Sequence, residues 1–194
     1  EGNLTISATD LQTSMTTSLA VESKEEGKVA VPSRILLDTL KTLPDQPISF
    51  NIDDNNFSIE ISAGDGKYKL SGENGDDFPK IQVVENASSV NLPASVLTEA
   101  ITKTIFAVSN DELRPAMTGV YCQLSPQHIT FVATDAHKLV RYRRNGLNSP
   151  IEASFILPKK PLNILKNIAQ SVNEEVKIEF NKQNIFFGFE NFSL

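Results

Sequence analysis

The sequence predicts an α+β protein assembled from repeated units, each with one helix and several antiparallel strands. Three observations support that fold class: apolar residues that alternate as in half-buried strands, three helical segments that each follow a proline, and an internal repeat of about 125 residues. A content of 40% hydrophobic and 22% charged residues is ordinary for a globular chain, so a sizeable core can form.

The internal repeat consists of two pairs of matching segments. Residues 4–10 (LTISATD) match residues 129–135 (ITFVATD) at an offset of 125. Residues 31–41, which open with Val-Pro, match residues 157–166, which open with Leu-Pro, at an offset of 126. In both copies a strand that ends in Ala-Thr-Asp precedes a proline-started helix and then a hairpin. This common order indicates a duplicated unit.

Three helices are predicted over 31–43, 92–105 and 157–170. A proline lies at the start of each, and we expect it in the first turn, where its missing N–H leaves no hydrogen bond unmade. The spacing of Leu97 and Ile101 in the middle helix is typical of a buried stripe. The three starts are 61 and 65 residues apart, which divides each repeat into two halves with one helix apiece.

Two hairpins are predicted from alternating apolar residues. The first pairs residues 48–52 with 57–61, and the second pairs 176–180 with 185–189. Residues 64–67 (GDGK) predict a further hairpin turn, because they lack the spacing of a phosphate-binding loop.

Two segments are predicted to be irregular. Residues 71–79 are rich in Gly and Asp and indicate a polar loop, whose acidic residues 73–77 lack the spacing of a calcium-binding loop. Residues 82–90 indicate an extended connection between two units.

The net charge of −6 argues against a uniformly basic nucleic-acid-binding protein and against a polybasic membrane-surface protein. The charge is unevenly distributed, because the three helical segments carry +1, 0 and +3, which leaves −10 on the rest of the chain. Such helices suit a polyanion, although ordinary solvated helix faces explain the same charges. Arg141 and Arg143 add a second basic run and share one face of a predicted strand.

Groups suited to catalysis or metal binding are scarce. The single cysteine, Cys122, excludes an intrachain disulfide and lies in an apolar stretch, so we expect a buried, inert thiol. Asp135 and His137 are two residues apart, and we expect them to organise a turn at the end of a strand rather than a catalytic dyad. We therefore expect no catalytic residues, no metal and no cofactor.

The chain has no apolar run near the roughly 20 residues that span a bilayer. Its first residues also lack the basic and apolar segments of a signal peptide. We expect a soluble, cytoplasmic protein without a membrane partner.

Several segments resemble the bacterial DNA polymerase III β sliding clamp family. Residues 106–120 (FAVSNDELRPAMTGV) resemble the family's FAVS-x-DE-x-RP-x-x-x-G signature, and residues 133–139 (ATDAHKL) resemble its ATD[GA]H[RK]L segment. Residues 31–34 (VPSR) resemble the helix start of the first domain, and residues 77–79 (DFP) resemble the end of that domain. The resemblance covers essentially the whole chain.

The resemblance implies a DNA-clamp fold in which two protomers, each of three similar domains, close head-to-tail into a homodimeric ring around duplex DNA. Helices line the hole and antiparallel sheets form the outer wall. Residues 1–88 would be the later part of the first domain, whose first half is missing, and residues 89–194 a nearly complete second domain; the third domain is absent.

The resemblance also implies a role in DNA replication without catalysis. The ring is a processivity factor that tethers the replicative polymerase and so turns repeated rebinding into an intramolecular event. The polymerase, the clamp loader and other proteins would bind it through short linear peptides.

Three groups of site residues follow from the resemblance. The residues expected to bind DNA, through phosphates and without base readout, are Arg34, Lys41, Asp111, Arg114, Lys159, Lys160 and Lys166. The residues expected in an apolar cleft for partner peptides are Met117, Thr134, Ala136, His137, Lys138 and Leu139. The residues expected at the ring interface, on an edge strand, are Lys67, Tyr68, Lys69 and Leu70.

Two other functions fit parts of the sequence. A β-rich hydrolase would use Asp135 and His137, and loss of a hydrolytic activity in His137→Ala would support it. A sheet-based ligand-binding module of an export pathway would be supported by a signal peptide in the full-length gene.

Overall fold

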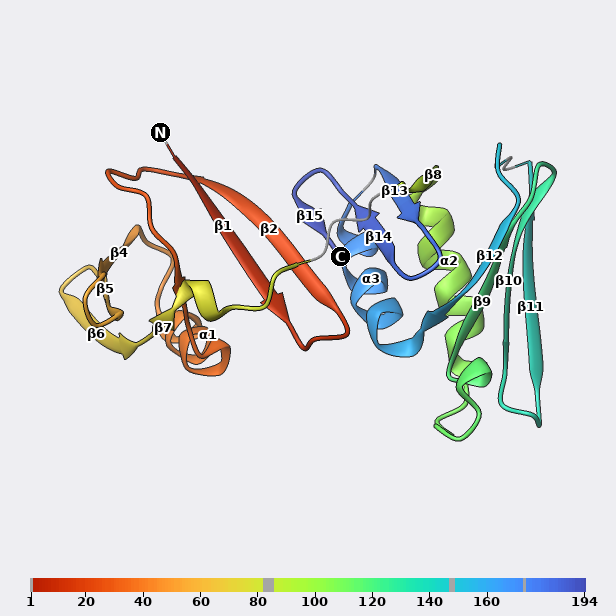
Figure 1. Cartoon of the computed structure of the whole chain (residues 1–194), viewed down its shortest axis with the longest axis horizontal. Coiled ribbons are helices and arrows are strands. Elements are labelled where there is room, and N and C mark those ends of the chain that lie inside the picture. The colour runs from red at the N-terminus through yellow and green to blue at the C-terminus, as the bar shows by residue number, and fades with distance from the viewer. Residues whose placement is uncertain (1, 82–85, 147–148, 173) are drawn as a thin grey trace. The chain divides into compact units, whose positions relative to one another are not determined.

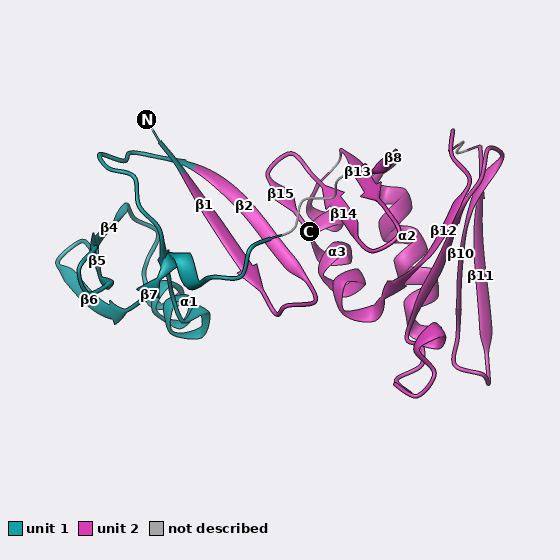
Figure 2. Ribbon diagram, viewed as in Figure 1, with its two compact units in different colours: residues 1–3, 20–81 teal, residues 4–19, 82–194 magenta. Residues whose placement is uncertain are grey.

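The computed structural model describes residues 2–81, 86–146, 149–172 and 174–194. The chain divides into two compact units (Figure 2). We call residues 1–3 and 20–81 the first unit, and residues 4–19 and 82–194 the second unit. Both contain helix and antiparallel sheet, which confirms the predicted α+β class (Figure 1).

The first unit is built on a three-stranded antiparallel sheet in the order β4-β5-β6. Its elements are β3 (Val29–Ala30), α1 (Ser33–Thr42), β4 (Ile48–Asp53), β5 (Ser58–Ala63), β6 (Gly66–Ser71), β7 (Glu73–Asn74) and a 3₁₀ helix (Gly75–Asp77). The predicted hairpin and the turn at 64–67 are confirmed. Ile59, Ile61 and Ala63 alternate on β5 and form the buried core of this unit.

The predicted polar loop over 71–79 is wrong in its middle. Residues 73–74 pair with residues 29–30 as the β7–β3 ladder, and residues 75–77 form the 3₁₀ turn. The Asn74 side chain accepts a hydrogen bond from the backbone N–H of Asp76 at 2.9 Å. This side-chain cap stabilises a turn that a Gly- and Asp-rich composition alone does not distinguish from an irregular loop.

The second unit contains two antiparallel sheets, in the orders β1-β2-β15-β14-β13-β8 and β11-β10-β9-β12. The strands of the first sheet are β1 (Gly2–Thr9), β2 (Ser14–Val21), β8 (Ser88–Pro93), β13 (Glu175–Phe180), β14 (Ile185–Gly188) and β15 (Phe192–Ser193). The strands of the second sheet are β9 (Gly119–Leu124), β10 (His128–Thr134), β11 (Leu139–Asn145) and β12 (Ala153–Pro158). The predicted hairpin of residues 176–180 and 185–189 is confirmed as β13–β14.

Helices α2 (Ala94–Thr104) and α3 (Lys159–Ser171) pack against each other and against strands of both sheets (Figure 1). The helix α2 buries Leu97 and Ile101, as its sequence predicts, and α3 buries Leu162 and Leu165. These side chains join the strands in one hydrophobic core. None of the helices in the described part of the chain is long and apolar enough to cross a membrane.

The helices begin later than predicted. Pro32, Pro93 and Pro158 each stand one residue before the first helical residue, rather than within the first turn. The last two also end strands β8 and β12. A proline can close a strand because the ladder needs no further N–H there.

The predicted connection over 82–90 is also corrected. Its residues 88–90 belong to β8, which pairs with β13 in the six-stranded sheet, and residues 82–85 lie outside the described residues. The sequence did not disclose this strand because its partner lies more than 80 residues further along the chain.

The two copies of the internal repeat have the same hydrogen bonds in the turn at Ala-Thr-Asp. The carboxylate of Asp10 accepts hydrogen bonds from the backbone N–H groups two and three residues later, at 3.0 and 2.7 Å. Asp135 accepts the equivalent pair at 3.0 and 2.9 Å. The next residues, Leu11 and Ala136, have φ angles of 73° and 74°. The two copies therefore share one turn with one left-handed residue.

Candidate functional site

The start of α3 holds two of the residues predicted to bind DNA, and both have partners within the chain. The ammonium of Lys159 donates to Oδ1 of Asn110 at 2.8 Å. Lys160 forms an ion pair with Asp10, and this bond is the main cause that lowers the pKa of the Asp10 carboxyl to about 2. Lys166 follows on the same helix and is half-buried.

The segment before β9 brings together two further residues predicted to bind DNA. Arg114 donates through Nε to the Asp111 carboxylate at 2.8 Å, and this pair lowers the pKa of Asp111. The other carboxylate oxygen accepts the backbone N–H of Leu113 at 3.0 Å. The side chain of Leu113 is 91% exposed, so this loop projects into solvent. The sequence placed Asp111 and Arg114 at one site, and here they form one ion pair.

The remaining residues predicted to bind DNA, Arg34 and Lys41, lie on α1 in the first unit. The Arg34 side chain is 94% exposed, and its nearest carboxylate is that of Asp38 at 3.9 Å. Lys41 lies in the last turn of α1, where a cation complements the helix dipole. Both cations extend into solvent.

Five of the residues predicted for the peptide cleft form one turn between β10 and β11. Thr134 donates through its hydroxyl to the backbone oxygen of Lys138 at 2.7 Å, and its hydroxyl accepts the N–H of Ala136 at 3.2 Å. His137, Lys138 and Leu139 are exposed, with Leu139 at 67%. Hydrogen bonds therefore hold the backbone of the turn, and its side-chain surface is exposed.

Met117 reaches the same end of the sheet from another element. It ends the short 3₁₀ helix η3 (Pro115–Met117), two residues before β9 begins. The antiparallel register of β9 and β10 places the start of β9 beside the end of β10, where the turn begins. The fold thus brings Met117 to the end of the sheet that carries residues 134–139.

The predicted role of Asp135 as a turn organiser is confirmed. One carboxylate oxygen accepts two backbone N–H bonds and the other pairs with the Lys138 ammonium. These interactions hold the pKa of Asp135 well below its ordinary value. A carboxylate committed to its own turn is not free to orient His137 as a general base, which disfavours the hydrolase hypothesis.

The cysteine is buried, and the described side chains form no group suited to a metal ion. Cys122 is 2% exposed, and burial raises the pKa of its thiol to about 12, which confirms the prediction of a buried, inert thiol. Within the described ranges, no three His, Cys, Asp or Glu side chains form a group that could hold a metal ion.

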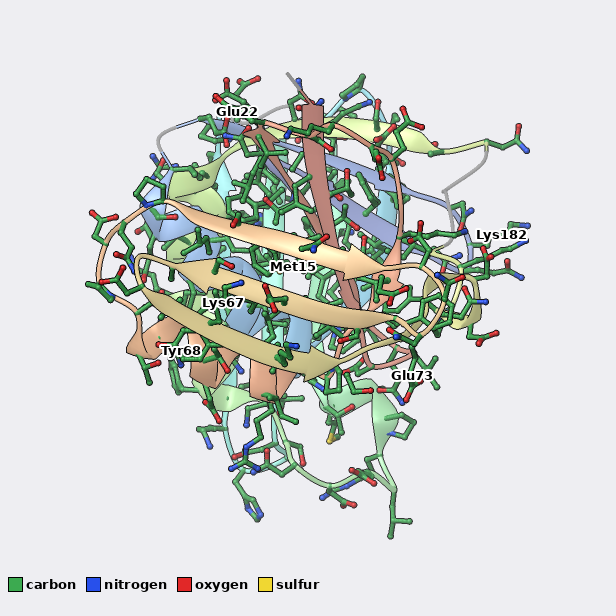
Figure 3. All side chains as sticks on the ribbon, turned by 90° about the vertical axis from the view of Figure 1, so that its left-hand side faces the viewer. Met15, Glu22, Lys67, Tyr68, Glu73 and Lys182 are labelled. Atoms are coloured by element: carbon green, nitrogen blue, oxygen red, sulfur yellow. The ribbon has the colours of Figure 1, made fainter. Side chains whose placement is uncertain are left out.

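The residues predicted for a ring interface lie on β6, which is an edge strand as expected (Figure 3). Lys67 and Lys69 both pair with Glu60 on β5, at 3.0 and 3.7 Å, and the Lys67 bond is the main cause that lowers the pKa of Glu60. Leu70, on the opposite face, helps to line a cavity of about 250 Å³ that also contacts Ile35 of α1. This edge combines paired cations with an apolar recess.

Sequence reasoning missed the partners of these site residues. Asn110, Asp10 and Glu60 each contact a predicted cation, and none of them was predicted as its partner. For Asp10 a signal existed, because it occupies the Ala-Thr-Asp position of the first copy. Asn110 and Glu60 are identified only by proximity in the fold.

Comparison with protein families finds two matches that together span most of the chain. Residues 1–82 match the DNA polymerase III beta subunit, N-terminal domain, and residues 91–194 match the DNA polymerase III beta subunit, central domain. Among curated proteins, the chain is 30% identical to the beta sliding clamps of Synechococcus elongatus and Halalkalibacterium halodurans over 85% and 88% of its length. It spans only 44% and 46% of those two proteins.

Solved structures give the same result. The crystal structure of a putative DNA polymerase III beta subunit from Eubacterium rectale superposes with a TM-score of 0.92 at 26% identity, over 100% of this chain and 53% of that chain. The sliding clamp from Bartonella birtlesii bound to griselimycin superposes with a TM-score of 0.91 at 26% identity, over 100% of this chain and 53% of that chain.

Proposed function

The chain belongs to the DNA polymerase III beta subunit family, and on that premise we propose that the protein carrying it is a sliding clamp. The clamp is a ring that encircles duplex DNA without sequence specificity and tethers the replicative polymerase, and it catalyses no reaction itself. The observation that carries the proposal is the match of two successive domains of the family, in order. The predicted clamp fold is confirmed by the solved structures.

In this proposal residues 1–88 are the later part of the first domain, and residues 89–194 are the second domain. The first half of the first domain and a third domain would lie outside this chain. The compact units divide slightly differently, because strand β2 pairs with β15 and so draws residues 4–19 into the second unit. The proposed domain boundary follows the sequence resemblance, whereas the boundary between the compact units follows the pairing of strands.

DNA binding would use cations that contact phosphates and do not read bases, as sliding requires. Arg34 is the strongest of these residues, because it lies near the start of α1 and its side chain is almost wholly exposed. Lys41 and Lys166 are weaker candidates on α1 and α3, and Lys166 is half-buried. Arg114 would reach DNA from the projecting loop together with Asp111. Lys159 and Lys160 would contribute positive potential at the start of α3, although each already has a partner.

Partner binding would use the turn 134–139 and Met117. The exposed Leu139 and the half-buried Met117 supply apolar contact area, and Met adapts to peptides of different sequence. The replicative polymerase, the clamp loader and other partners would insert short linear peptides there. A head-to-tail homodimer would form through Lys67, Tyr68, Lys69 and Leu70 on the free edge of β6. We place this activity in the cytoplasm, where bacterial DNA is replicated.

Encirclement can be tested by comparing circular DNA with the same DNA after it has been cut. The full-length protein, loaded onto nicked circular DNA by a clamp loader, should co-elute with that DNA in gel filtration. Cutting the circle once should release it, because a ring slides off an open end. Retention on the linear DNA would contradict encirclement, and release from the uncut circle at the same rate would contradict a closed ring.

A further inference from the structure

Lys159 holds both ends of the loop that precedes β9. Its ammonium donates to Asn110 at the start of that loop, at 2.8 Å, and its backbone N–H donates to the carbonyl of Thr118 at the end, at 3.3 Å. The two residues that it contacts are 49 and 41 positions earlier in the chain. Lys159 is itself half-buried, unlike the exposed Lys160 next to it. The Lys159 side chain is directed at Asn110 and is not extended toward a ligand. We call this Lys159–Asn110 contact the brace, because it connects the loop to α3.

The loop between these contacts is a closed, internally bonded unit. The backbone N–H of Ser109, a residue that is 8% exposed, donates to the carbonyl of Met117 at 2.9 Å and closes its base. The N–H of Met117 in turn donates to the carbonyl of Arg114 at 2.9 Å. Arg114 and Met117 are therefore linked directly, although one is proposed to bind DNA and the other a partner peptide.

The position of Lys159 on its helix supports the same interpretation. It is the first residue of α3, where the helix dipole disfavours a cation. A hydrogen-bond acceptor at 2.8 Å offsets that penalty, and the N-terminal helical N–H finds its acceptor in Thr118. The loop thus supplies the acceptors for the Lys159 ammonium and for the first backbone N–H of α3.

We infer that Lys159 is a positioning residue that fixes the loop 109–117 to the start of α3 and thereby couples DNA contact at Arg114 to the position of Met117 in the peptide site. The inference rests on the proposed function for what the two sites bind. The brace itself, Lys159 with Asn110, is independent of that function. Since coupling between two binding sites is reciprocal, a bound peptide should also alter DNA affinity through the same loop.

The first test concerns the brace and uses the full-length protein without DNA. Lys159→Met and Asn110→Ala should each accelerate amide hydrogen exchange across 109–117 by about tenfold or more, and the double variant should add little, because both remove one interaction. Lys159→Arg should restore slow exchange. Lys166→Met is the matched control, since it removes a cation from the same helix and should leave exchange in the loop unchanged. Unchanged exchange in Asn110→Ala, which alters only an exposed loop side chain, would overturn the inference.

The second test concerns the coupling and uses a plain DNA duplex as the probe. Adding the duplex to protein labelled with ¹³C at methionine methyls should shift the Met117 resonance, which Met117→Leu identifies. Lys159→Met and Asn110→Ala should lose most of that shift, while Lys182→Met, which removes an exposed cation outside the proposed DNA-binding residues, should retain it. Both brace variants should also keep the salt slope of DNA binding, whereas loss of a direct phosphate contact lowers that slope by about 0.9.

The outcomes separate the inference from the proposed function. If Lys159→Met alone lowers the salt slope and Asn110→Ala has no effect on the Met117 shift, Lys159 is a phosphate ligand and the inference is wrong. If the wild-type protein does not bind the duplex, the proposed function fails, and the hydrogen-exchange result still decides whether Lys159 braces the loop.

Discussion

Strands β4 and β13 have the same apolar alternation but opposite environments. Ile48, Phe50 and Ile52 on β4 are 38%, 41% and 38% exposed, whereas the equivalent Val176, Ile178 and Phe180 on β13 are 0%, 2% and 8% exposed. The two strands occupy the same place in the repeat, each following a proline-started helix and opening a hairpin.

The difference comes from neighbours and not from the strands themselves. β13 lies between β8 and β14, and its unit contains two helices that pack together, whereas β4 is the edge of its sheet. The helices differ in the same way, because α3 buries Leu162 and Leu165 while all ten residues of α1 keep some exposure. Alternation thus predicts which face of a strand is apolar, and the presence of a covering element decides how much that face contributes to stability.

The largest test of this comparison truncates one residue in each strand. Ile178→Ala should destabilise the second unit by about 2–5 kcal/mol, because it leaves a cavity in a closed core. Phe50→Ala should cost the first unit well under half of that, since its ring already contacts water. Denaturant unfolding of this chain, followed by hydrogen exchange in each unit, measures both values. Equal losses of stability would contradict the comparison, because they would mean that the apolar face of β4 is buried as fully as that of β13.

A second test uses a glycine that permits close packing in the second unit. A Cβ at Gly119 would lie 2.4 Å from the carbonyl oxygen of Leu157, a backbone atom that the β9–β12 ladder holds in place. Gly119→Ala should therefore destabilise the second unit by about 1–3 kcal/mol. The control is Gly188→Ala, where the nearest atoms are at 3.7 Å or more. Comparable thermal unfolding of both variants would contradict the proposed clash.

A third test compares two carboxylates whose pKa values are lowered for different reasons. The pKa of Asp10, in the second unit, falls from 3.8 to about 2 mainly through the bond from Lys160, and that of Asp53, in the first unit, is lowered mainly by the backbone N–H of Asn55. A carboxyl group whose pKa is lower in the folded state than in the unfolded state stabilises the fold. This stabilisation is complete above the pKa of the unfolded state, near 4, and it is lost as the pH falls through the pKa of the folded state.

Asp10→Asn should accordingly lower stability at pH 7, and the deficit should shrink between about pH 4 and pH 2. High salt should also shrink the deficit, because it screens the Lys160 pair. The matched variant Asp53→Asn should show the pH dependence with less salt dependence. Unfolding midpoints measured against pH at two salt concentrations provide the comparison, and equal salt dependence would contradict the assigned causes.

The smallest expected effect compares the two copies of the Ala-Thr-Asp turn. Leu11 and Ala136 have φ angles of 73° and 74°, where a Cβ is disfavoured by about 1–2 kcal/mol. Replacing either by Gly relieves that strain but adds unfolded-chain entropy, so each variant should gain no more than about 1 kcal/mol. Thermal unfolding measures the gain. Destabilisation by Ala136→Gly would mean that the methyl group makes contacts that outweigh the strain.

Much of the fold followed from local patterns in the sequence. The strands of both hairpins and the existence of all three helices were predictable because each depends on residues two to four positions apart. The Asp135 turn was also predictable, since its carboxylate bonds to N–H groups of the same turn. The boundaries were less accurate, because Pro93 and Pro158 end strands as well as precede helices.

The sequence by itself therefore determined the α+β class, the repeat, the family and the candidate site residues, all of which are written in short, contiguous motifs. Only the tertiary structure decided which cations already have partners: Lys159 with Asn110, Lys160 with Asp10, and Lys67 with Glu60. It also decided that β13 is buried and β4 is not. The physical reason is that ion pairing and burial depend on distances between residues up to 150 positions apart, and a linear pattern does not contain those distances.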